Sequence, residues 1–336
     1  MQTRVIGLVY DLLGTHPRRD GDPPDADAEY EPESTVATLE AAIARLGHRS
    51  RRIGNPHALL AGAGKGELPA LDAALCIAEG YGSRNREAWA PILLDMLGIP
   101  ALGSDALTLS LSLDKLWTKN VVAAAGVPVA PHAVARSAAA VRELALPAPF
   151  PLFVKPRWEG TAKGIGLSSR VEDRAALERE VARVVERYRQ PALIEAFVGG
   201  PEYTVTVVGN DPPRALPVLQ RALEASSRIG LHALESATPP AAGFDHCVPG
   251  TLEPALEDAL VGLALRAYDA LCCLDFARAD FRIDADGRPR FLEINPLPTF
   301  ARDGSFGVLA ELAGRPLEAL LAEVFEAGLR RLGLAP

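Results

Sequence analysis

Apolar positions in the first part of the chain indicate strands that alternate with helices. A short apolar run at residues 5–10 predicts a buried strand, and residues 49–53 and 73–77 are predicted as the second and third strands. Between the first two lies residues 33–47, a segment whose apolar residues recur at helical spacing and which ends at a glycine. Strands alternating with helices indicate an α/β layer built on a parallel sheet.

The rest of the chain predicts further helices and strands. Helices are predicted at residues 91–97, 113–126, 172–188, 253–273 and 317–332. Strands are predicted at residues 151–156 and 214–219, and residues 192–205 predict a strand, a hinge and another strand. The helix at 172–188 is amphipathic, and its inward stripe is predicted to comprise Leu177, Val181, Val184 and Tyr188.

Residues 277–295 predict a β-hairpin whose turn contains Asp and Gly, which tolerate the backbone angles of a reversal. Pairing Ile283 with Arg288 would place Asp280 opposite Phe291. Four polar side chains then share one face: Arg278, Asp280, Glu293 and Asn295. Carboxylate and amide oxygens suit Mg²⁺, which also takes phosphate oxygens of a nucleotide. The alternative is an edge hairpin with a solvated charged face.

Two glycine-rich loops and two lysines are further candidates. Residues 157–166 follow a strand that ends in Lys155, so backbone N–H groups and an ammonium group could approach phosphate there. Residues 78–87 follow the third strand, where open α/β sheets bind ligands, and a simple connecting loop is the alternative. Lys115 and Lys119 lie four residues apart on one helix face, which alone predicts a solvated face.

Composition excludes several classes of protein. The 336 residues can form two or three domains, and the net charge of −8 without a basic run argues against nucleic acid as a partner. No uncharged apolar run reaches the ~18 residues of a membrane span, and the N-terminal strand lacks a signal-peptide cleavage site, so a cytoplasmic protein is expected. The four cysteines are predicted to be reduced thiols: Cys76, Cys247, Cys272 and Cys273.

With the hairpin segment Glu293-Ile-Asn295, the glycine-rich loop and the hinge strand in view, the chain resembles the ATP-grasp enzymes, most closely the D-alanine–D-alanine ligase branch. The resemblance covers nearly the whole chain. It implies an α/β fold in which an N-terminal parallel-sheet domain precedes a two-lobed ATP-grasp unit. The expected domains are residues 1–113, a central lid at residues 114–203, and a C-terminal part at residues 204–336 with the metal and acceptor sites.

The resemblance also implies a role for each candidate residue. ATP would be bound by Lys115 and Lys155 at the phosphates, Glu195 and Val198 at adenine and Glu202 at ribose, with Gly160, Thr161, Ala196 and Phe197 nearby. Two Mg²⁺ ions would be held by Asp280, Glu293 and Asn295. The substrates and the tetrahedral intermediate would be contacted by Arg278, Glu33, Thr161, Arg228, Thr299 and Ser305. A homodimer is implied by the family alone.

Four residues depart from the family pattern at its amino-acid sites: Glu79, Ala162, Ile229 and Thr299. The expected function is therefore an ATP-dependent ligase that joins a carboxylate to an amine through an acyl phosphate, with small-molecule substrates that differ from D-alanine. A genuine D-alanine–D-alanine ligase of cell-wall synthesis and a catalytically silent ATP-binding regulatory protein are the alternatives. Whether His232, Glu79 or Arg302 contacts substrate stays open.

Overall fold

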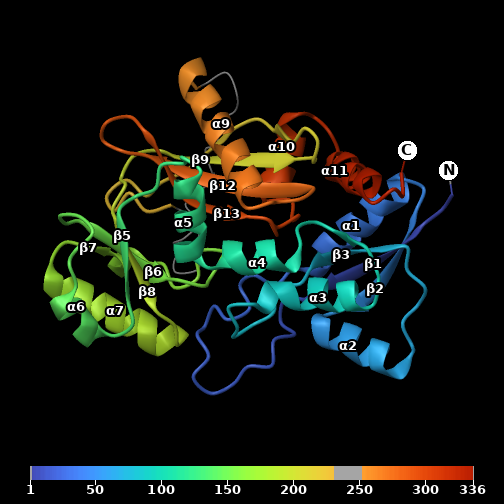
Figure 1. Ribbon diagram of the computed structural model, residues 1–336, viewed down its shortest axis with the longest axis horizontal. Coiled ribbons are helices and arrows are strands. Elements are labelled where there is room, and N and C mark those ends of the chain that lie inside the picture. Colours follow the sequence, from blue (N-terminus) through green and yellow to red (C-terminus); the bar gives the residue numbers. More distant parts are fainter. Residues whose placement is uncertain (1, 231–251, 336) are drawn as a thin grey trace.

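The computed structural model describes residues 2–230 and 252–335, which form three β-sheets with helices packed against them (Figure 1). The mixed α/β fold expected from the sequence is confirmed. The three sheets follow one another along the chain, and the predicted division at residues 113 and 203 stays a proposal that this arrangement supports. Among the helices of the described ranges, none combines the length and the hydrophobicity of a transmembrane span.

The first sheet is parallel and lies in the N-terminal part of the chain. Its strands, in spatial order, are β2 (Arg49–Gly54), β1 (Val5–Tyr10), β3 (Ala73–Ile77) and β4 (Ala101–Leu102). Its helices are α1 (Glu33–Arg45), α2 (Pro56–Lys65), α3 (Trp89–Met96) and α4 (Ala106–Leu113), with a short 3₁₀ turn at η1 (Arg86–Ala88). All five residues of β3 are buried, because helices cover both faces of the sheet.

The second sheet is antiparallel and carries two helices on one side. Its strands, in spatial order, are β5 (His132–Ala135), β8 (Ala192–Ala196), β6 (Leu152–Pro156) and β7 (Arg170–Val171). Its helices are α6 (Ala138–Glu143) and α7 (Arg174–Tyr188), with η2 (Leu167–Ser169) before β7. Leu177, Val181 and Val184 of α7 are fully buried against this sheet as predicted, whereas the Tyr188 hydroxyl donates to Asp25 at 2.9 Å.

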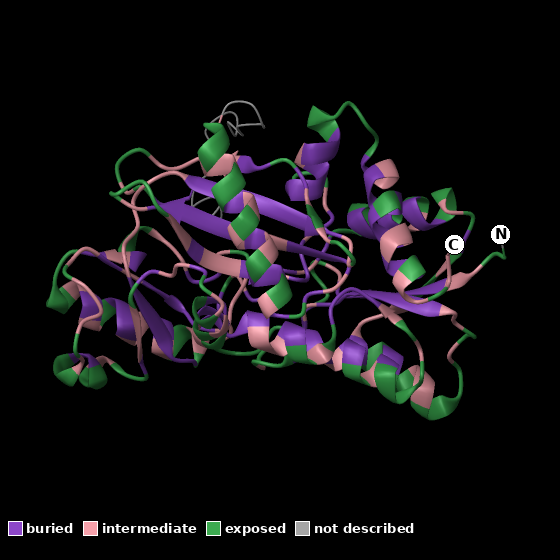
Figure 2. Cartoon of the chain, turned by 45° about the horizontal axis from the view of Figure 1, so that its top comes forward, coloured by how far each residue is buried: buried purple, intermediate pink, exposed green. Residues whose placement is uncertain are grey.

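The third sheet is also antiparallel and has one face covered by apolar side chains. Its strands are β10 (Arg214–Ala215), β9 (Glu202–Val208), β12 (Phe276–Ile283) and β13 (Pro289–Asn295), with β11 (Leu219–Arg221) also paired to β9. Helices α5 (Lys115–Ala124) and α9 (Pro254–Ala270) cover its apolar face, and α10 (Ser305–Leu312) and α11 (Leu317–Arg331) follow it. Figure 2 shows that the central strands are buried. The polar face is turned toward the site described below.

The predicted hairpin of β12 and β13 is confirmed, but its register differs from the prediction. Asp280 lies opposite Glu293 rather than Phe291, and the pairing shifts between Asp280 and Phe281. This bulge places one extra residue, Leu292, on β13. Phe291 can therefore point into the core against Phe281 while Glu293 remains on the polar face.

Two predicted elements are interrupted, and helices α2, α4, α6 and α10 have no counterpart among the predicted elements. The helix predicted at 113–126 is interrupted at Asp114, whose carboxylate accepts from the N–H groups of Leu116 and Trp117 and so begins α5. The strand predicted at 214–219 is divided into β10 and β11 around Pro217, which has no N–H for a sheet hydrogen bond.

Candidate active site

A cavity opens between the second and third sheets. Its walls come from the start of α5, from β6 and β8, from the hinge after β8, and from β9, β12 and β13. The predicted site residues that line it are Lys115, Lys155, Glu195, Ala196, Phe197, Val198, Glu202, Asp280 and Glu293. The fold thus brings together four segments that are far apart in the sequence.

Glu195 lies at the centre of a buried ion cluster. Its Oε2 is 2.7 Å from Lys155 Nζ and its Oε1 is 2.8 Å from Lys119 Nζ, and no side chain of the three is more than 7% exposed. Burial alone would raise the pKa of Glu195, but the two ammonium groups outweigh it and hold the pKa at about 2. Lys119 also donates to the carbonyls of Phe291 and Leu292. Its predicted place on a solvated face is therefore wrong.

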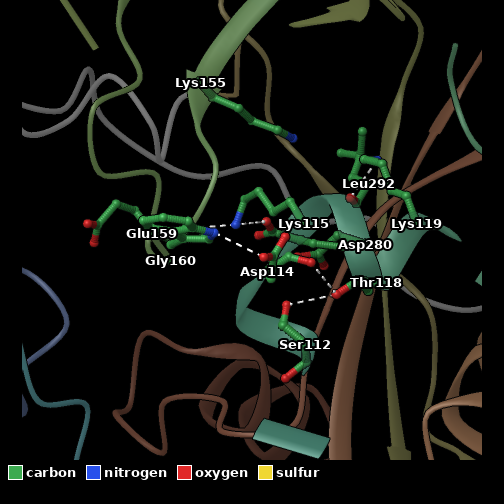
Figure 3. A network of polar contacts seen from close by, with 12 residues as sticks. Ser112, Asp114, Lys115, Thr118, Lys119, Lys155, Glu159, Gly160, Asp280 and Leu292 are labelled. Atoms are coloured by element: carbon green, nitrogen blue, oxygen red, sulfur yellow. Dashed lines mark hydrogen bonds and ion pairs between the residues drawn. The ribbon is translucent and has the colours of Figure 1, made fainter. Parts of the chain in front are cut away.

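Lys115 connects α5 to the glycine-rich loop and to β13. Its Nζ lies 3.0 Å from Glu293 Oε2 and donates to the carbonyl of Glu159 (Figure 3). Asp114, the preceding residue, accepts two hydrogen bonds from the Arg157 guanidinium at 2.7 and 2.8 Å. These contacts fix the position of the Lys115 ammonium group beside the cavity, because Asp114 and the carbonyl of Glu159 hold the lysine from two directions.

Asp280 and Glu293 lie directly opposite each other on neighbouring strands, and each already has a cationic partner. Arg278 lies 2.9 Å from Asp280, and the Thr204 hydroxyl donates to the same carboxylate at 2.7 Å. Although burial raises the pKa of Glu293, Lys115 and other nearby cations lower it to about 2. The Glu293 carboxylate is thus held in its ionised form, which is the form that binds a cation.

This set of oxygen atoms fits Mg²⁺. Residues 2–230 and 252–335 contain no group of three His, Cys, Asp or Glu side chains arranged for a metal ion. An ion here would therefore have Asp280 and Glu293 as its carboxylates and would complete its shell with water and phosphate oxygens, as Mg²⁺ commonly does. The amide oxygen of Asn295, the third predicted ligand, accepts from the N–H of Leu297 at 2.9 Å.

The hinge after β8 carries Phe197 and Val198, and β9 begins with Glu202. Arg282 of β12 lies 2.9 Å from the Glu202 carboxylate and donates to the Val198 carbonyl at 2.9 Å. The guanidinium of Arg170 lies 4.8 Å from the centre of the Phe197 ring. These contacts hold the hinge in place, so that the ring of Phe197 and the backbone of the hinge lie beside the cavity.

Carboxylates from residues 14–32 bind the backbone of the glycine-rich loop. Glu29 accepts from the N–H of Gly160 at 2.7 Å and pairs with Lys163 at 2.5 Å and with Arg86 at 2.8 Å. Asp25 accepts from the N–H of Gly164 at 3.0 Å. Burial would raise the pKa of Glu29, but Arg86 and Lys163 bring it to about 2. This network fastens the loop to the N-terminal sheet.

A second cavity shares Glu159 with the first. Residues 14–32 and the loop after β3 form much of its wall, and its aromatic lining includes Tyr81, Trp89 and Trp158. Burial and then the Glu87 carboxylate raise the pKa of Glu79, in the loop beside it. The region thus combines aromatic surface with an acid held in its neutral form.

Thr299 and Ser305 lie after β13, on the opposite side of the hairpin face. The Thr299 hydroxyl bonds to the carboxylate of Glu31, and burial raises the pKa of that carboxylate. Ser305 is the first residue of α10, and its hydroxyl accepts from Arg221 of β11 at 3.1 Å. Thr299, Ser305 and Arg278 were predicted to contact the substrates and the tetrahedral intermediate. Their partners in the structure are Glu31, Arg221 and Asp280, respectively.

Comparison with known proteins agrees with this geometry. A family described as "D-ala D-ala ligase C-terminus" matches residues 121–326. A protein of Desulforudis audaxviator named D-alanine–D-alanine ligase is 36% identical over 225 residues, which are 66% of this chain and 70% of that protein. The chain belongs to the D-alanine–D-alanine ligase family. Members of this family are ATP-grasp ligases that form C–N bonds.

Solved structures show the same fold. A D-alanine–D-alanine ligase from Bacillus anthracis complexed with ATP aligns with a TM-score of 0.69 at 21% identity and covers 98% of both chains. The VanG D-Ala:D-Ser ligase from Enterococcus faecalis aligns with a TM-score of 0.71 at 17% identity, over 97% of this chain and all of the other. The expected ATP-grasp architecture is thus established.

Eight of the residues assigned by the family resemblance do not line the first cavity: Glu33, Gly160, Thr161, Arg228, Arg278, Asn295, Thr299 and Ser305. The surroundings of three of them are informative. Glu33, at the start of α1, is exposed and pairs with Arg52, whereas the buried carboxylate near Thr299 belongs to Glu31. Arg228 is exposed, and its Nε donates to the carbonyl of Gly199 at 3.1 Å. Thr161 is exposed with a φ of 45°, and its neighbour Ala162 lines the cavity instead.

The role of Glu33 stays a prediction, which rests on its being the first acid of α1, whereas the carboxylate that the fold buries belongs to Glu31, two residues earlier. Arg228 was assigned by counting back from Thr238, and this residue and His232 lie outside the described residues. Arg302, another open candidate, is exposed.

Several residues of the site escaped prediction: Lys119, Arg282, Glu29, Glu31 and Arg221. Only Lys119 had a usable signal in the sequence, since it shares a helix face with Lys115. Strand alternation places the side chains of Arg282 and Arg221 on the polar face. Which residues they contact depends on the neighbouring strand, which the local sequence does not specify.

Proposed function

We propose that this chain is an ATP-dependent ligase that joins a carboxylate to an amine through an acyl phosphate, and that its substrate pair differs from two molecules of D-alanine. The observation that carries the chemistry is the convergence of Lys115, Lys155, Asp280 and Glu293 on one cavity. These groups provide two lysine side chains for phosphate oxygens and two carboxylate side chains for a metal.

In the first step a carboxylate oxygen of the donor attacks the γ-phosphorus of ATP. The bond from that phosphorus to the β-phosphate oxygen breaks, which gives an acyl phosphate and ADP. Lys115 and Lys155 neutralise charge on the phosphoryl oxygens. We propose that two Mg²⁺ ions on Asp280, Glu293 and Asn295 supply Lewis-acid stabilisation of the same oxygens when bound.

In the second step the amine nitrogen attacks the acyl carbon. The C–N bond forms, the C–O bond to phosphate breaks, and the amine proton passes to solvent. Arg278, held by Asp280 at 2.9 Å, faces the developing oxyanion together with backbone N–H groups near Thr299. We assign adenine to the hinge at residues 195–198 and ribose to Glu202.

The altered substrate pair is supported by the residues beside the nucleotide. Ala162 and Ile229 line the first cavity, and neither carries the hydroxyl that the family pattern has at these positions. Lys163 and Glu29 bring additional charge to the same loop. The aromatic second cavity offers more room than an alanine side chain needs. The fold itself does not decide the acceptor, because a D-Ala:D-Ser ligase shares it.

A genuine D-alanine–D-alanine ligase is the second candidate, and the name of the 36% identical relative favours it. A catalytically silent ATP-binding protein is the third, but the presence of Asp280 and Glu293 directly opposite each other beside the cavity speaks against it. Small-molecule acids and amines are the proposed partners, and a homodimer is proposed from the family alone.

The test measures phosphate release from ATP with a panel of acids and amines that includes D-alanine, D-serine and the L-amino acids. We expect the highest kcat/KM with a pair other than two D-alanines. Full turnover with D-alanine alone would overturn the altered substrate pair. ATP binding without turnover on any pair would overturn the ligase and favour the silent protein.

A further inference from the structure

The β-bulge of β13 determines which side chain lies opposite Asp280. Phe291 and Glu293 are two positions apart, so in a regular strand their side chains would share one face of the sheet. Here Phe291 is fully buried in the apolar core, whereas Glu293 lines the cavity together with its neighbour Leu292. The extra residue Leu292 therefore allows Glu293 to pair with Asp280 on the polar face.

Lys119 of α5 contacts the backbone of this bulge. Its Nζ donates to the carbonyl of Phe291 at 3.1 Å and to the carbonyl of Leu292 at 2.9 Å (Figure 3). Successive carbonyls of a regular strand point in opposite directions, so a single ammonium group can bond both only where the strand is irregular. The two hydrogen bonds therefore favour the bulged conformation over a regular strand.

Lys119 is fully buried, and three oxygen atoms lie within 3.1 Å of its ammonium group, which has three N–H donors. The third oxygen is Oε1 of Glu195 at 2.8 Å, and Oε2 of the same carboxylate lies 2.7 Å from Lys155 Nζ. Because Glu195 and Lys155 alone would already balance each other in charge, Lys119 is not needed to neutralise Glu195. Its hydrogen bonds to β13 therefore give it a second role.

Helix α5 holds the segment around Glu293 at two points that are one helical turn apart. Lys115 Nζ lies 3.0 Å from the Glu293 carboxylate, and Lys119 bonds the carbonyl of the peptide group that precedes Glu293. The first contact acts on the side chain, which can rotate, and the second acts on the backbone from which it extends. The position of the Glu293 carboxylate relative to Asp280 therefore depends on Lys119.

We propose that Lys119 is a positioning residue for the metal site, and that it acts through the bulge of β13 to keep Glu293 opposite Asp280. Lys119 does not line the cavity, so it affects the metal only through β13. Its loss weakens the binding of Mg²⁺ together with ATP and slows phosphoryl transfer, but it does not weaken the binding of ATP without metal. This inference rests on the proposed ligase function and adds a residue to its metal site.

The test measures ATP binding by titration calorimetry, once with Mg²⁺ and once with EDTA, and the ratio of the two Kd values is the gain from the metal. K119M removes the N–H donors but leaves Glu195 and Lys155 as a balanced pair. We expect the gain to fall about 10- to 100-fold, with a similar loss in kcat for ADP formation. The Kd in EDTA stays within about threefold of the wild-type value. K119R, which keeps the charge and N–H donors, restores part of the gain.

A double-mutant cycle with E293Q separates positioning from general support of the fold. Because Lys119 acts through Glu293, adding K119M to E293Q changes the gain by less than about twofold. The matched control is T108V, which removes another buried donor to a carbonyl: the Thr108 hydroxyl donates to Leu271 at 3.0 Å, within α4 and away from the cavity. T108V keeps the wild-type gain. Thermal melts establish that each variant is folded.

Four results would overturn the inference. The first is a wild-type gain in folded K119M. The second is an equal loss with Mg²⁺ and with EDTA, because Lys119 would then support the whole cavity. The third is an additive loss when K119M is combined with E293Q. The fourth is failure of both K119M and K119R to fold, because the role of Lys119 would then be purely structural.

The proposed function fails separately. A wild type that binds ATP with the full gain from Mg²⁺, but turns over no acid and amine of the panel, would overturn the ligase function. The cycle of Lys119 and Glu293 would still decide the inference in that case, because it measures binding. A wild type that gains nothing from Mg²⁺ would overturn both the metal site and the inference.

Discussion

Replacement of Glu195 by Gln tests whether the buried ion cluster is a structural support of the nucleotide cavity. The carboxylate lies 2.8 Å from Lys119 and 2.7 Å from Lys155, and Lys119 is fully buried. Removing it leaves two buried ammonium groups without a counter-charge, a change that costs about 3–5 kcal/mol in comparable sites. The lowering of the Glu195 pKa from 4.5 to about 2 corresponds to about 3 kcal/mol, so both routes agree.

The same cluster predicts a pH dependence with a definite sign. Because the pKa of Glu195 is lower in the folded state, its contribution to stability is complete above about pH 4.5 and is lost as the pH falls toward 2. The difference in the free energy of unfolding between wild type and E195Q is therefore flat from pH 5 to pH 8. It shrinks below about pH 4.

Urea titrations of both proteins at several pH values, followed by circular dichroism, measure this difference. E172Q is the matched control, since Glu172 forms an ion pair with Arg170 but is 61% exposed, and its loss changes stability by less than about 1 kcal/mol. A difference for E195Q below about 1 kcal/mol at pH 7, or one that does not change down to pH 3, would refute the reasoning.

Three further variants test Glu293 of the proposed metal site, Glu29 beside the glycine-rich loop, and Glu31 beside Thr299. E293Q lowers kcat for ADP formation about 100-fold and weakens ATP binding in the presence of Mg²⁺, which calorimetry measures, because one carboxylate of the metal site is lost. E29Q removes the negative charge that pairs with Lys163 and Arg86 beside the N–H of Gly160, and hydrogen exchange of the loop peptide accelerates about tenfold. E31Q raises a substrate KM about tenfold or more, whereas E33Q leaves the KM values unchanged.

A specific result would contradict each of these three predictions. Equal ATP affinity of E293Q and wild type with Mg²⁺ would remove Glu293 from the metal site, and measurements without Mg²⁺ are the control. Unchanged exchange at Gly160 in E29Q, with R18Q as an exposed control from the same segment, would show that Glu29 does not hold the loop. A raised substrate KM in E33Q, together with wild-type KM values in E31Q, would support the assignment of Glu33 rather than Glu31 to substrate contact.

Much of the fold was predictable from local patterns. The strands at residues 5–10 and 73–77 and the inward stripe of α7 were correct because apolar spacing depends on side chains near one another in the chain. The shared face of Arg278, Asp280, Glu293 and Asn295 was also predictable, because side chains alternate along a strand. The register of the hairpin was not predictable, because a one-residue bulge has no clear sequence pattern.

The environment of a side chain was much less predictable. Lys119 and Glu33 are both charged residues on amphipathic helices, yet one is fully buried between Glu195 and β13 and the other is exposed. Glu29 meets Gly160 across 131 residues of sequence. Charge compensation of this kind depends on which distant segments are brought into contact.

The amino-acid sequence by itself determined the longer helices and strands, the oxygen donors of the hairpin and the place of Lys155 on β6, because backbone preferences and side-chain alternation act over a few residues. Only the tertiary structure decided that Glu31 rather than Glu33 approaches Thr299, that Lys119 supports Glu195, and that Arg221 lies beside Ser305. These facts depend on packing between separate sheets, where burial and the nearest opposite charge set the state of each group.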